Sequence, residues 1–212
     1  MERTFVKDWR GVHKAALALI LRCIADHGSP PSPAELQVAT AAPSAETVQH
    51  MLQEMESRGL IFRDPGSGSI LAAYPLSAVP TPHRVRLADG RQVQAMCAVD
   101  ALGVALVFGQ DTHISSRCRH CRADIEVSVV GERIGAYSPA SAVVWYTPAA
   151  VHCAVAAEGQ CPYINFFCSR EHVKDWKRDL SAPRGQILPL ERALDRARAV
   201  FNPMKGLGGG PS

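Results

Sequence analysis

The spacing of apolar residues predicts helices in the first third of the chain. Residues 11–28, 32–40 and 41–59 each carry apolar side chains three and four positions apart, which is the period of an amphipathic helix. Residues 60–75 instead form two short apolar runs on either side of the turn-forming stretch DPGSG. This second pattern predicts a two-stranded hairpin.

Residues with known helix-end preferences support these three helices. Gly28 ends the first, and Gly59 ends the third. Ser32 stands in the N-cap position of the second, with Pro33 at the first helical position and Glu35 in the place of a capping box. Three helices followed by a hairpin, in this order, resemble a winged helix-turn-helix.

The pattern changes after residue 92. Residues 93–109 are almost continuously apolar and predict a helix. Short strand-like runs follow at 111–118, 123–139 and 142–148. An amphipathic helix is then predicted over 169–180, with Ser169 as its N-cap.

The predicted fold class is α+β. A winged-helix-like helical domain is followed by a mixed α/β domain with antiparallel strands and a treble-clef-like cysteine segment. The predicted division is 1–75 for the first domain, 76–92 for a linker and hairpin, 93–200 for the second domain and 201–212 for a glycine-rich, disordered tail.

Composition and charge exclude some classes of protein. The 212 residues are 47% hydrophobic, enough for one large core or two small ones. A net charge of +3 is too small to indicate nucleic-acid binding, and the glutamate-rich third helix also disfavours nucleic acid as a partner. The chain lacks the run of about 18 apolar residues that a membrane span needs, and no leader cleavage site follows its N-terminal apolar stretch. We therefore expect a cytoplasmic protein without membrane contact.

The seven cysteines, an odd number, do not suggest a disulfide framework in a cytoplasmic chain. Metal binding, nucleophilic chemistry and burial are the remaining roles. Cys23 lies on the first apolar helix and is expected in the core, whereas Cys153 has no patterned neighbours and receives no role. His113, His120 and His152 lie near cysteines, but a lone histidine is more often a surface residue than a ligand, so we assign them no role.

Cys97 and Asp100 stand out within the apolar stretch 93–109. Positions three apart share one face of a helix, so the thiol and the carboxylate are expected to point into the same space. Taken alone, the pattern is also typical of a buried cysteine followed by a helix-capping aspartate.

Four segments together resemble the organomercurial (alkylmercury) lyase family. They are CAVD at 97–100, SSRC at 115–118, CPYINFF at 161–167 and FFCSREHVKDW at 166–176. Their order and spacing match over residues 93–180, so the resemblance implies a lyase-like catalytic domain over 93–200. The family also carries a winged-helix-like N-terminal domain, so the resemblance covers about the whole chain, although in the N-terminal part it is architectural only.

The resemblance implies that Cys97 and Cys161 hold mercury and that Asp100 carries the proton. Mercury(II) is a soft metal that prefers thiolates, and protonation of the departing carbon needs a positioned acid. The implied substrate is a small organomercurial, and the implied products are a hydrocarbon and thiol-bound mercury(II). No redox cofactor is required; an external thiol would release the metal, and a mercuric reductase would receive it.

The sequence departs from the family between the second cysteine and the aromatic pair. Tyr163 and Asn165 stand where family members often have histidines.

Extra sulfur is the larger departure. Cys118 and Cys121 form a C-x2-C knuckle, and Cys168 and His172 stand at the start of the helix predicted from 169. This arrangement resembles a treble-clef site, and a Cys3His set suits tetrahedral zinc, so these four residues are a candidate structural zinc site. The alternative is a buried Cys118, which has a counterpart in the family, beside two additional exposed thiols.

Two non-enzymatic alternatives remain open. The protein could be a soft-metal-responsive winged-helix regulator or a metal carrier without catalysis. Asp100 discriminates between these classes, because a sensor or carrier needs thiols but has no need of a carboxylate beside Cys97.

Overall fold

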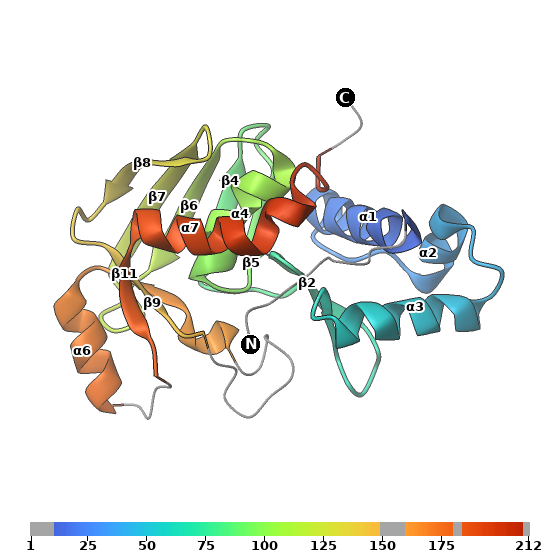
Figure 1. Cartoon of the computed structure of the whole chain (residues 1–212), viewed down its shortest axis with the longest axis horizontal. Helices are drawn as coiled ribbons and strands as arrows, with labels where there is room; N and C mark the ends of the chain where they lie inside the picture. Colours follow the sequence, from blue (N-terminus) through green and yellow to red (C-terminus); the bar gives the residue numbers. More distant parts are fainter. Residues whose placement is uncertain (1–10, 149–159, 180–183, 210–212) are drawn as a thin grey trace.

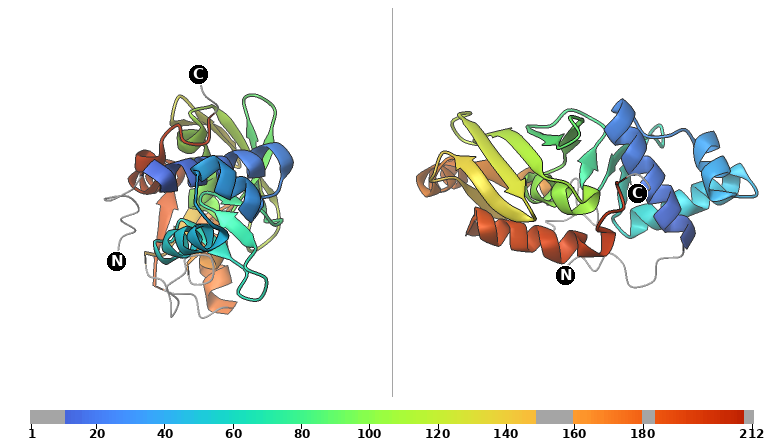
Figure 2. Two further views of the ribbon diagram at one scale, coloured as in Figure 1. Left: turned by 90° about the vertical axis from the view of Figure 1, so that its right-hand side faces the viewer. Right: turned by 90° about the horizontal axis from the view of Figure 1, so that it is seen from above.

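The computed structural model describes residues 11–148, 160–179 and 184–209. The molecule is elongated, with helices α1, α2 and α3 at one end and α6 at the other (Figure 1). Figure 2 shows the same arrangement from one end and from above. Cys153 and His152 lie outside the described residues.

Three helices and a wing form the N-terminal part, as predicted. They are α1 (Gly11–His27), α2 (Pro33–Thr40), α3 (Ala45–Ser57), β1 (Ile61–Arg63) and β2 (Ile70–Ala73). The Ser32 hydroxyl accepts the Glu35 N–H at 3.3 Å and the Glu35 carboxylate accepts the Ser32 N–H at 2.7 Å, which confirms the capping box. Apolar side chains of α1 and α3 fill the core between the helices.

One antiparallel sheet of eight strands continues from the wing into the second half of the chain. The six strands after the wing are β3 (Leu76–Ser77), β4 (His83–Leu87), β5 (Gln92–Ala95), β6 (Thr112–Arg117), β7 (Asp124–Val130) and β8 (Arg133–Ser138). Their order in the sheet is β1-β2-β3-β5-β4-β6-β7-β8. Residues 76–92 therefore contain the expected hairpin, but they are paired sheet strands rather than a free linker. The domain bounds themselves stay a prediction.

Helix α4 (Ala98–Phe108) is the buried centre of the second half. All eleven of its residues are buried, and it packs against β4, β5, β6 and α7. The predicted helix over 93–109 is corrected at its start, because residues 93–95 are extended and pair with β4 and β3. The apolar run thus contains a buried strand followed by a buried helix, two elements whose periodicity alone cannot separate them.

A second antiparallel sheet, in the order β10-β9-β11, carries the last two α-helices. Its strands are β9 (Val143–Tyr146), β10 (Asn165–Phe167) and β11 (Gln186–Pro189), and the helices are α6 (Arg170–Asp179) and α7 (Leu190–Phe201). The helix predicted over 169–180 is therefore α6, and a further helix, α7, follows it. The α+β class is confirmed.

Within the described ranges, no helix has the length and apolar character that crossing a membrane requires.

The glycine-rich segment after α7 packs against α4. The N–H groups of Gly206 and Gly208 donate to the carbonyls of Leu106 and Val107 at 3.1 and 2.9 Å. These carbonyls lie in the last turn of α4, where no intrahelical donor is left for them. The predicted disordered tail over 201–212 is therefore corrected for residues 201–209.

Candidate active site

Cys97 and Asp100 meet because the first turn of α4 brings them together. Cys97 is the N-cap residue, with extended backbone, and its sulfur accepts the backbone N–H of Asp100 at 3.5 Å. A cysteine here takes the place of the Ser, Thr or Asp that usually satisfies a free N–H at a helix start. Asp100 is therefore not the capping residue, because the Cys97 thiol caps the helix.

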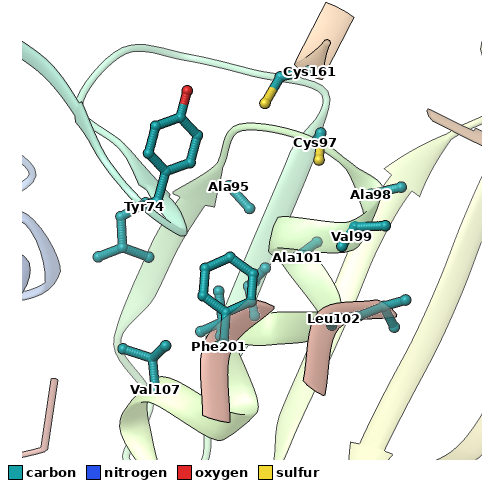
Figure 3. Packing of buried hydrophobic residues seen from close by; sticks show 14 of the residues in the cluster. Tyr74, Ala95, Cys97, Ala98, Val99, Ala101, Leu102, Val107, Cys161 and Phe201 are labelled. Atoms are coloured by element: carbon teal, nitrogen blue, oxygen red, sulfur yellow. The ribbon is translucent and has the colours of Figure 1, made fainter. Parts of the chain in front are cut away.

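Cys161 reaches the same place from a distant segment. It begins the short 3-10 helix η1 (Cys161–Tyr163), which leads into β10. The Ala98 N–H donates to the Ile164 carbonyl at 3.1 Å, which fastens this segment to the start of α4. The Cys161 thiol then donates to the Asp100 carboxylate across 3.5 Å. Figure 3 shows the two cysteine side chains near each other above α4, with the Tyr74 ring on the same side.

The three side chains form a compact and buried set of metal donors. One donor atom from each of Cys97, Asp100 and Cys161 lies within 4.8 Å of the other two. Their exposed fractions are 2%, 1% and 3%. The structure therefore brings together all three residues predicted for the mercury site, in a geometry that a single ion could bridge.

Burial controls the proton affinity of this site. It raises the pKa of the Cys97 thiol well above its usual range, and the contact with Cys161 and the negative charge of Asp100 raise it further. The thiol thus holds its proton until a cation replaces it. A soft metal ion is such a cation, since thiolates bind it in preference to protons.

A polar network supports the strand that follows Cys161. The Asn165 amide donates to the Pro162 carbonyl at 2.8 Å and also contacts His83. His83 is fully buried and shares a hydrogen bond of 2.9 Å with the Ser116 hydroxyl. Burial lowers its pKa to about 4, so the ring is neutral at pH 7. The sequence offered no signal for His83, because a single histidine in an alternating strand carries no motif.

The other predicted cluster also assembles. Cys118 and Cys121 lie at the β6–β7 turn, and Cys168 and His172 lie at the start of α6. The four donor atoms lie within 4.8 Å of one another. Cys118 is buried, Cys168 and His172 are half-buried, and Cys121 is exposed. The treble-clef order predicted from the sequence, a knuckle followed by ligands at a helix start, is therefore present.

The thiols of this cluster differ in proton affinity. Burial raises the pKa of Cys118, but backbone N–H groups of Cys121, Cys168 and His120, together with the His172 ring, outweigh it and bring the pKa to about 6. Burial and the neighbouring Cys121 and Cys118 raise the pKa of Cys168 to about 12. A thiolate at one of these cysteines thus raises the pKa of its neighbours, so a second thiol stays protonated when no cation is present.

Cys23, His113 and His120 are not members of either donor set. Cys23 is only half-buried on α1, which corrects the expectation of a core residue, because its side chain is at the margin of the apolar face. His113 pairs with Glu126 at 2.7 Å on the sheet surface. The His120 ring lies 5.0 Å from that of His172, beside the second cluster.

Fold and site together define a class of protein. It is an α+β protein in which a winged-helix-like unit runs into a sheet, and two buried thiols and a carboxylate converge on the space of one soft metal ion. The model of the alkylmercury lyase family matches residues 76–202. The chain belongs to this family.

Similar proteins support this assignment. An alkylmercury lyase from Staphylococcus epidermidis is 31% identical over 169 residues, covering 79% of this chain and 74% of the relative. An alkylmercury lyase from Bacillus cereus is 32% identical over 167 residues, with 78% and 72% covered. The crystal structure of the mercury-bound form of MerB2 superposes with a TM-score of 0.76 at 29% identity, covering 93% of each chain.

The N-terminal part matches a different model. Residues 13–68 match the LexA DNA binding domain, which agrees with the winged-helix-like architecture of α1–β2. The match covers most of α1, all of α2 and α3, and β1 with the turn that follows it, but it ends before β2. No residue of either cysteine cluster lies within it.

Proposed function

We propose that the protein is an organomercurial lyase that cleaves carbon–mercury bonds by protonolysis. The observation that carries this proposal is the hydrogen bond from the Cys161 thiol to the Asp100 carboxylate, with Cys97 within reach of the same ion. Thiols alone would bind mercury. The carboxylate between them adds a group that can move a proton.

The reaction balances with these three groups. For a substrate R–Hg–X, one thiol binds mercury as X leaves with its proton. The second thiol gives its proton to Asp100 and its sulfur binds the same mercury ion. Asp100 then delivers that proton to the carbon as the carbon–mercury bond breaks, in the manner of a general acid. The products are R–H and mercury(II) bridged between Cys97 and Cys161.

Charge development favours the start of α4 as the place for this chemistry. Two thiols become thiolates during the reaction, and the N-terminal end of a helix stabilises negative charge. Exclusion of water by the buried surroundings leaves Asp100 as the proton source beside the carbon. Neither step requires a redox cofactor.

Release of the metal needs a partner outside the site. Because two buried thiolates hold mercury tightly, an external thiol is needed to take it by ligand exchange. We assign the protein to the cytoplasm, where thiols stay reduced. A mercuric reductase would then receive the released ion.

Arene production tests the proposal directly. Purified protein is incubated with an arylmercurial and excess free thiol, and the arene is measured by gas chromatography. Protein with Cys23→Ala serves as a matched control, because Cys23 lies on α1, away from the donor set. Stoichiometric mercury binding without any arene would overturn the enzymatic assignment and favour a carrier.

A regulator is the second candidate function, favoured by the match to a DNA-binding domain. The charges of α3 oppose it. Glu54 on α3 shares a hydrogen bond with His13, and Glu56 forms an ion pair with Arg63. The helix therefore offers carboxylates rather than a row of basic groups for phosphates. We therefore propose that this unit does not bind nucleic acid. Binding of the protein to a DNA duplex at physiological ionic strength, weakened by added salt, would contradict that view.

A further inference from the structure

Three cysteines and a histidine gather about the β6–β7 turn, separate from the proposed mercury site. We infer that Cys118, Cys121, Cys168 and His172 bind one structural zinc ion, which fastens α6 and β10 to the β6–β7 hairpin. This inference does not depend on the lyase activity, because none of the four residues takes part in the proposed reaction.

The donor distances fit a tetrahedral ion. With Zn–S of about 2.3 Å and Zn–N of about 2.0 Å, two donors on one ion lie roughly 3.5–3.8 Å apart. The Cys121 and Cys168 sulfurs are 3.6 Å apart, and the Cys118 sulfur is 3.8 Å from Nδ1 of His172. The Cys168 sulfur lies 2.8 Å from the same nitrogen, so this one edge must open when the ion binds.

The backbone between β6 and β7 forms a tight, hydrogen-bonded turn around the two knuckle cysteines. The Cys118 N–H donates to the Ala123 carbonyl at 2.8 Å, and the Arg122 N–H donates back to the Cys118 carbonyl at 3.0 Å. Arg122 follows the second cysteine with a φ of 66°, a left-handed conformation that is costly for a residue with a side chain. The turn brings the sulfurs of Cys118 and Cys121 within 4.8 Å of each other. Metal binding by both sulfurs would offset the cost of the left-handed residue.

Among the described residues, α6 packs against the second sheet through a narrow apolar face and the ring contacts of Trp176. Its buried apolar side chains are Val173 and Trp176, and the Trp176 ring packs on Phe167 with centroids 5.2 Å apart. A ten-residue helix with so narrow an apolar face is marginal unless it is tied to the rest of the protein. A zinc ion bound by Cys168 and His172 would supply that tie at the first turn.

The same ion would support the segment that carries Cys161. The Arg119 N–H, next to the first knuckle cysteine, donates to the Phe166 carbonyl of β10 at 3.1 Å. Strand β10 begins shortly after η1, which holds Cys161. The zinc site would therefore stabilise β10, the strand that follows Cys161 and helps to position this reactive thiol.

Ligand chemistry favours zinc over other occupants. Four protein donors of the Cys3His type close the tetrahedron and leave no open position, which is typical of a structural zinc site. A disulfide is the other covalent outcome, but the sulfurs of Cys121 and Cys168 are far beyond the bonded distance of about 2.05 Å. Both cysteines are free in this structure.

Metal analysis of the full-length protein tests the inference. Untagged protein from zinc-replete cells should carry about one zinc per chain, measured by inductively coupled plasma mass spectrometry. The double variant Cys97→Ser/Cys161→Ser should keep that zinc, as should the control Cys23→Ser, whereas Cys121→Ser and His172→Gln should lose most of it. Zinc that disappears with Cys97 and Cys161 but persists in Cys121→Ser would overturn the assignment.

A second measurement does not depend on the folding of any variant. Native protein is stripped with a chelator under reducing conditions and refilled with cobalt(II), which should give the intense thiolate charge-transfer band and visible bands of a tetrahedral site. The melting temperature should fall on stripping and return on adding zinc. Unchanged melting with no tetrahedral cobalt spectrum, or a Cys121–Cys168 disulfide found by peptide mapping, would refute the zinc site.

Discussion

The Cys161 thiol donates a hydrogen bond to the Asp100 carboxylate at 3.5 Å, although the two residues are 61 positions apart in the chain. In the proposed reaction, this contact joins a thiol that would bind mercury to the carboxylate that would carry the proton. Cys97, at the N-cap of the same helix, completes the donor set.

Loss of either thiol should abolish turnover. Cys97→Ala and Cys161→Ala each leave one sulfur where the reaction needs two on the same metal. Arene release should fall by at least about 10²-fold in both variants, while Cys23→Ala should stay close to the wild-type rate. Full activity of Cys161→Ser would contradict the assignment, since a hydroxyl is a poor ligand for a soft metal.

Asp100→Asn should separate binding from catalysis. The amide keeps the shape of the side chain but cannot carry the proton. The variant should still form a stoichiometric mercurial adduct, seen by intact-protein mass spectrometry, while hydrocarbon release falls by roughly 10²-fold or more. Turnover at the wild-type rate would show instead that the carboxylate has a structural task only.

Acid should weaken the fold through His83. Its pKa of about 4 lies below the ordinary histidine value of 6.5, so below pH 6.5 the unfolded chain takes up a proton while the folded protein stays neutral at this residue. The resulting loss of stability begins as the pH falls below 6.5 and is complete below about 4.

Denaturant titrations at pH 7.5, 6 and 5 measure this loss, with pH values chosen to span the expected window. His83→Gln should be less stable at pH 7.5, because it disturbs the contacts with Ser116 and Asn165, but its stability should fall less steeply with acid. Parallel curves for the two proteins would mean that His83 does not carry the acid dependence.

Gly103→Ala should destabilise the protein through the α4–α7 contact. A Cβ at this position would overlap the Phe201 ring, and α4 has no free side from which to relax. The free energy of unfolding should fall by about 1–3 kcal/mol, the usual cost of overpacking. Gly11→Ala is the matched control, because a Cβ there meets nothing within 4 Å. Equal stability of both variants would contradict the packing seen between the helices.

Local features were open to prediction because neighbours in sequence decide them. The capping box at Ser32, the hairpin turn after β1 and the approach of Cys97 to Asp100 each depend on residues a few positions apart. The first turn of any helix that began near Cys97 would bring its N-cap thiol to the residue three positions on. The sequence did not show that the helix begins there, since the preceding residues are equally apolar.

Long-range relationships required the folded chain. The entry of residues 76–92 into the sheet depends on pairing with strands on both sides, and the packing of residues 201–209 depends on the free carbonyls at the end of α4. No short-range pattern encodes either one. The resemblance to a family supplied Cys161 as a partner for Asp100, but composition and periodicity could not.

The sequence by itself determined which chemistry the protein can carry: soft thiols, a carboxylate in an apolar setting, and a second set of Cys3His ligands with the spacing of a knuckle and a helix start. Only the tertiary structure decided which of these groups meet. The hydrogen bond from Ala98 to Ile164 brings Cys161 to Asp100, and the approach of α6 to the β6–β7 turn brings His172 to Cys118. The physical reason is that residues within one helical turn are held together by the backbone, whereas distant residues meet only when packing offsets the entropy of closing the loop between them.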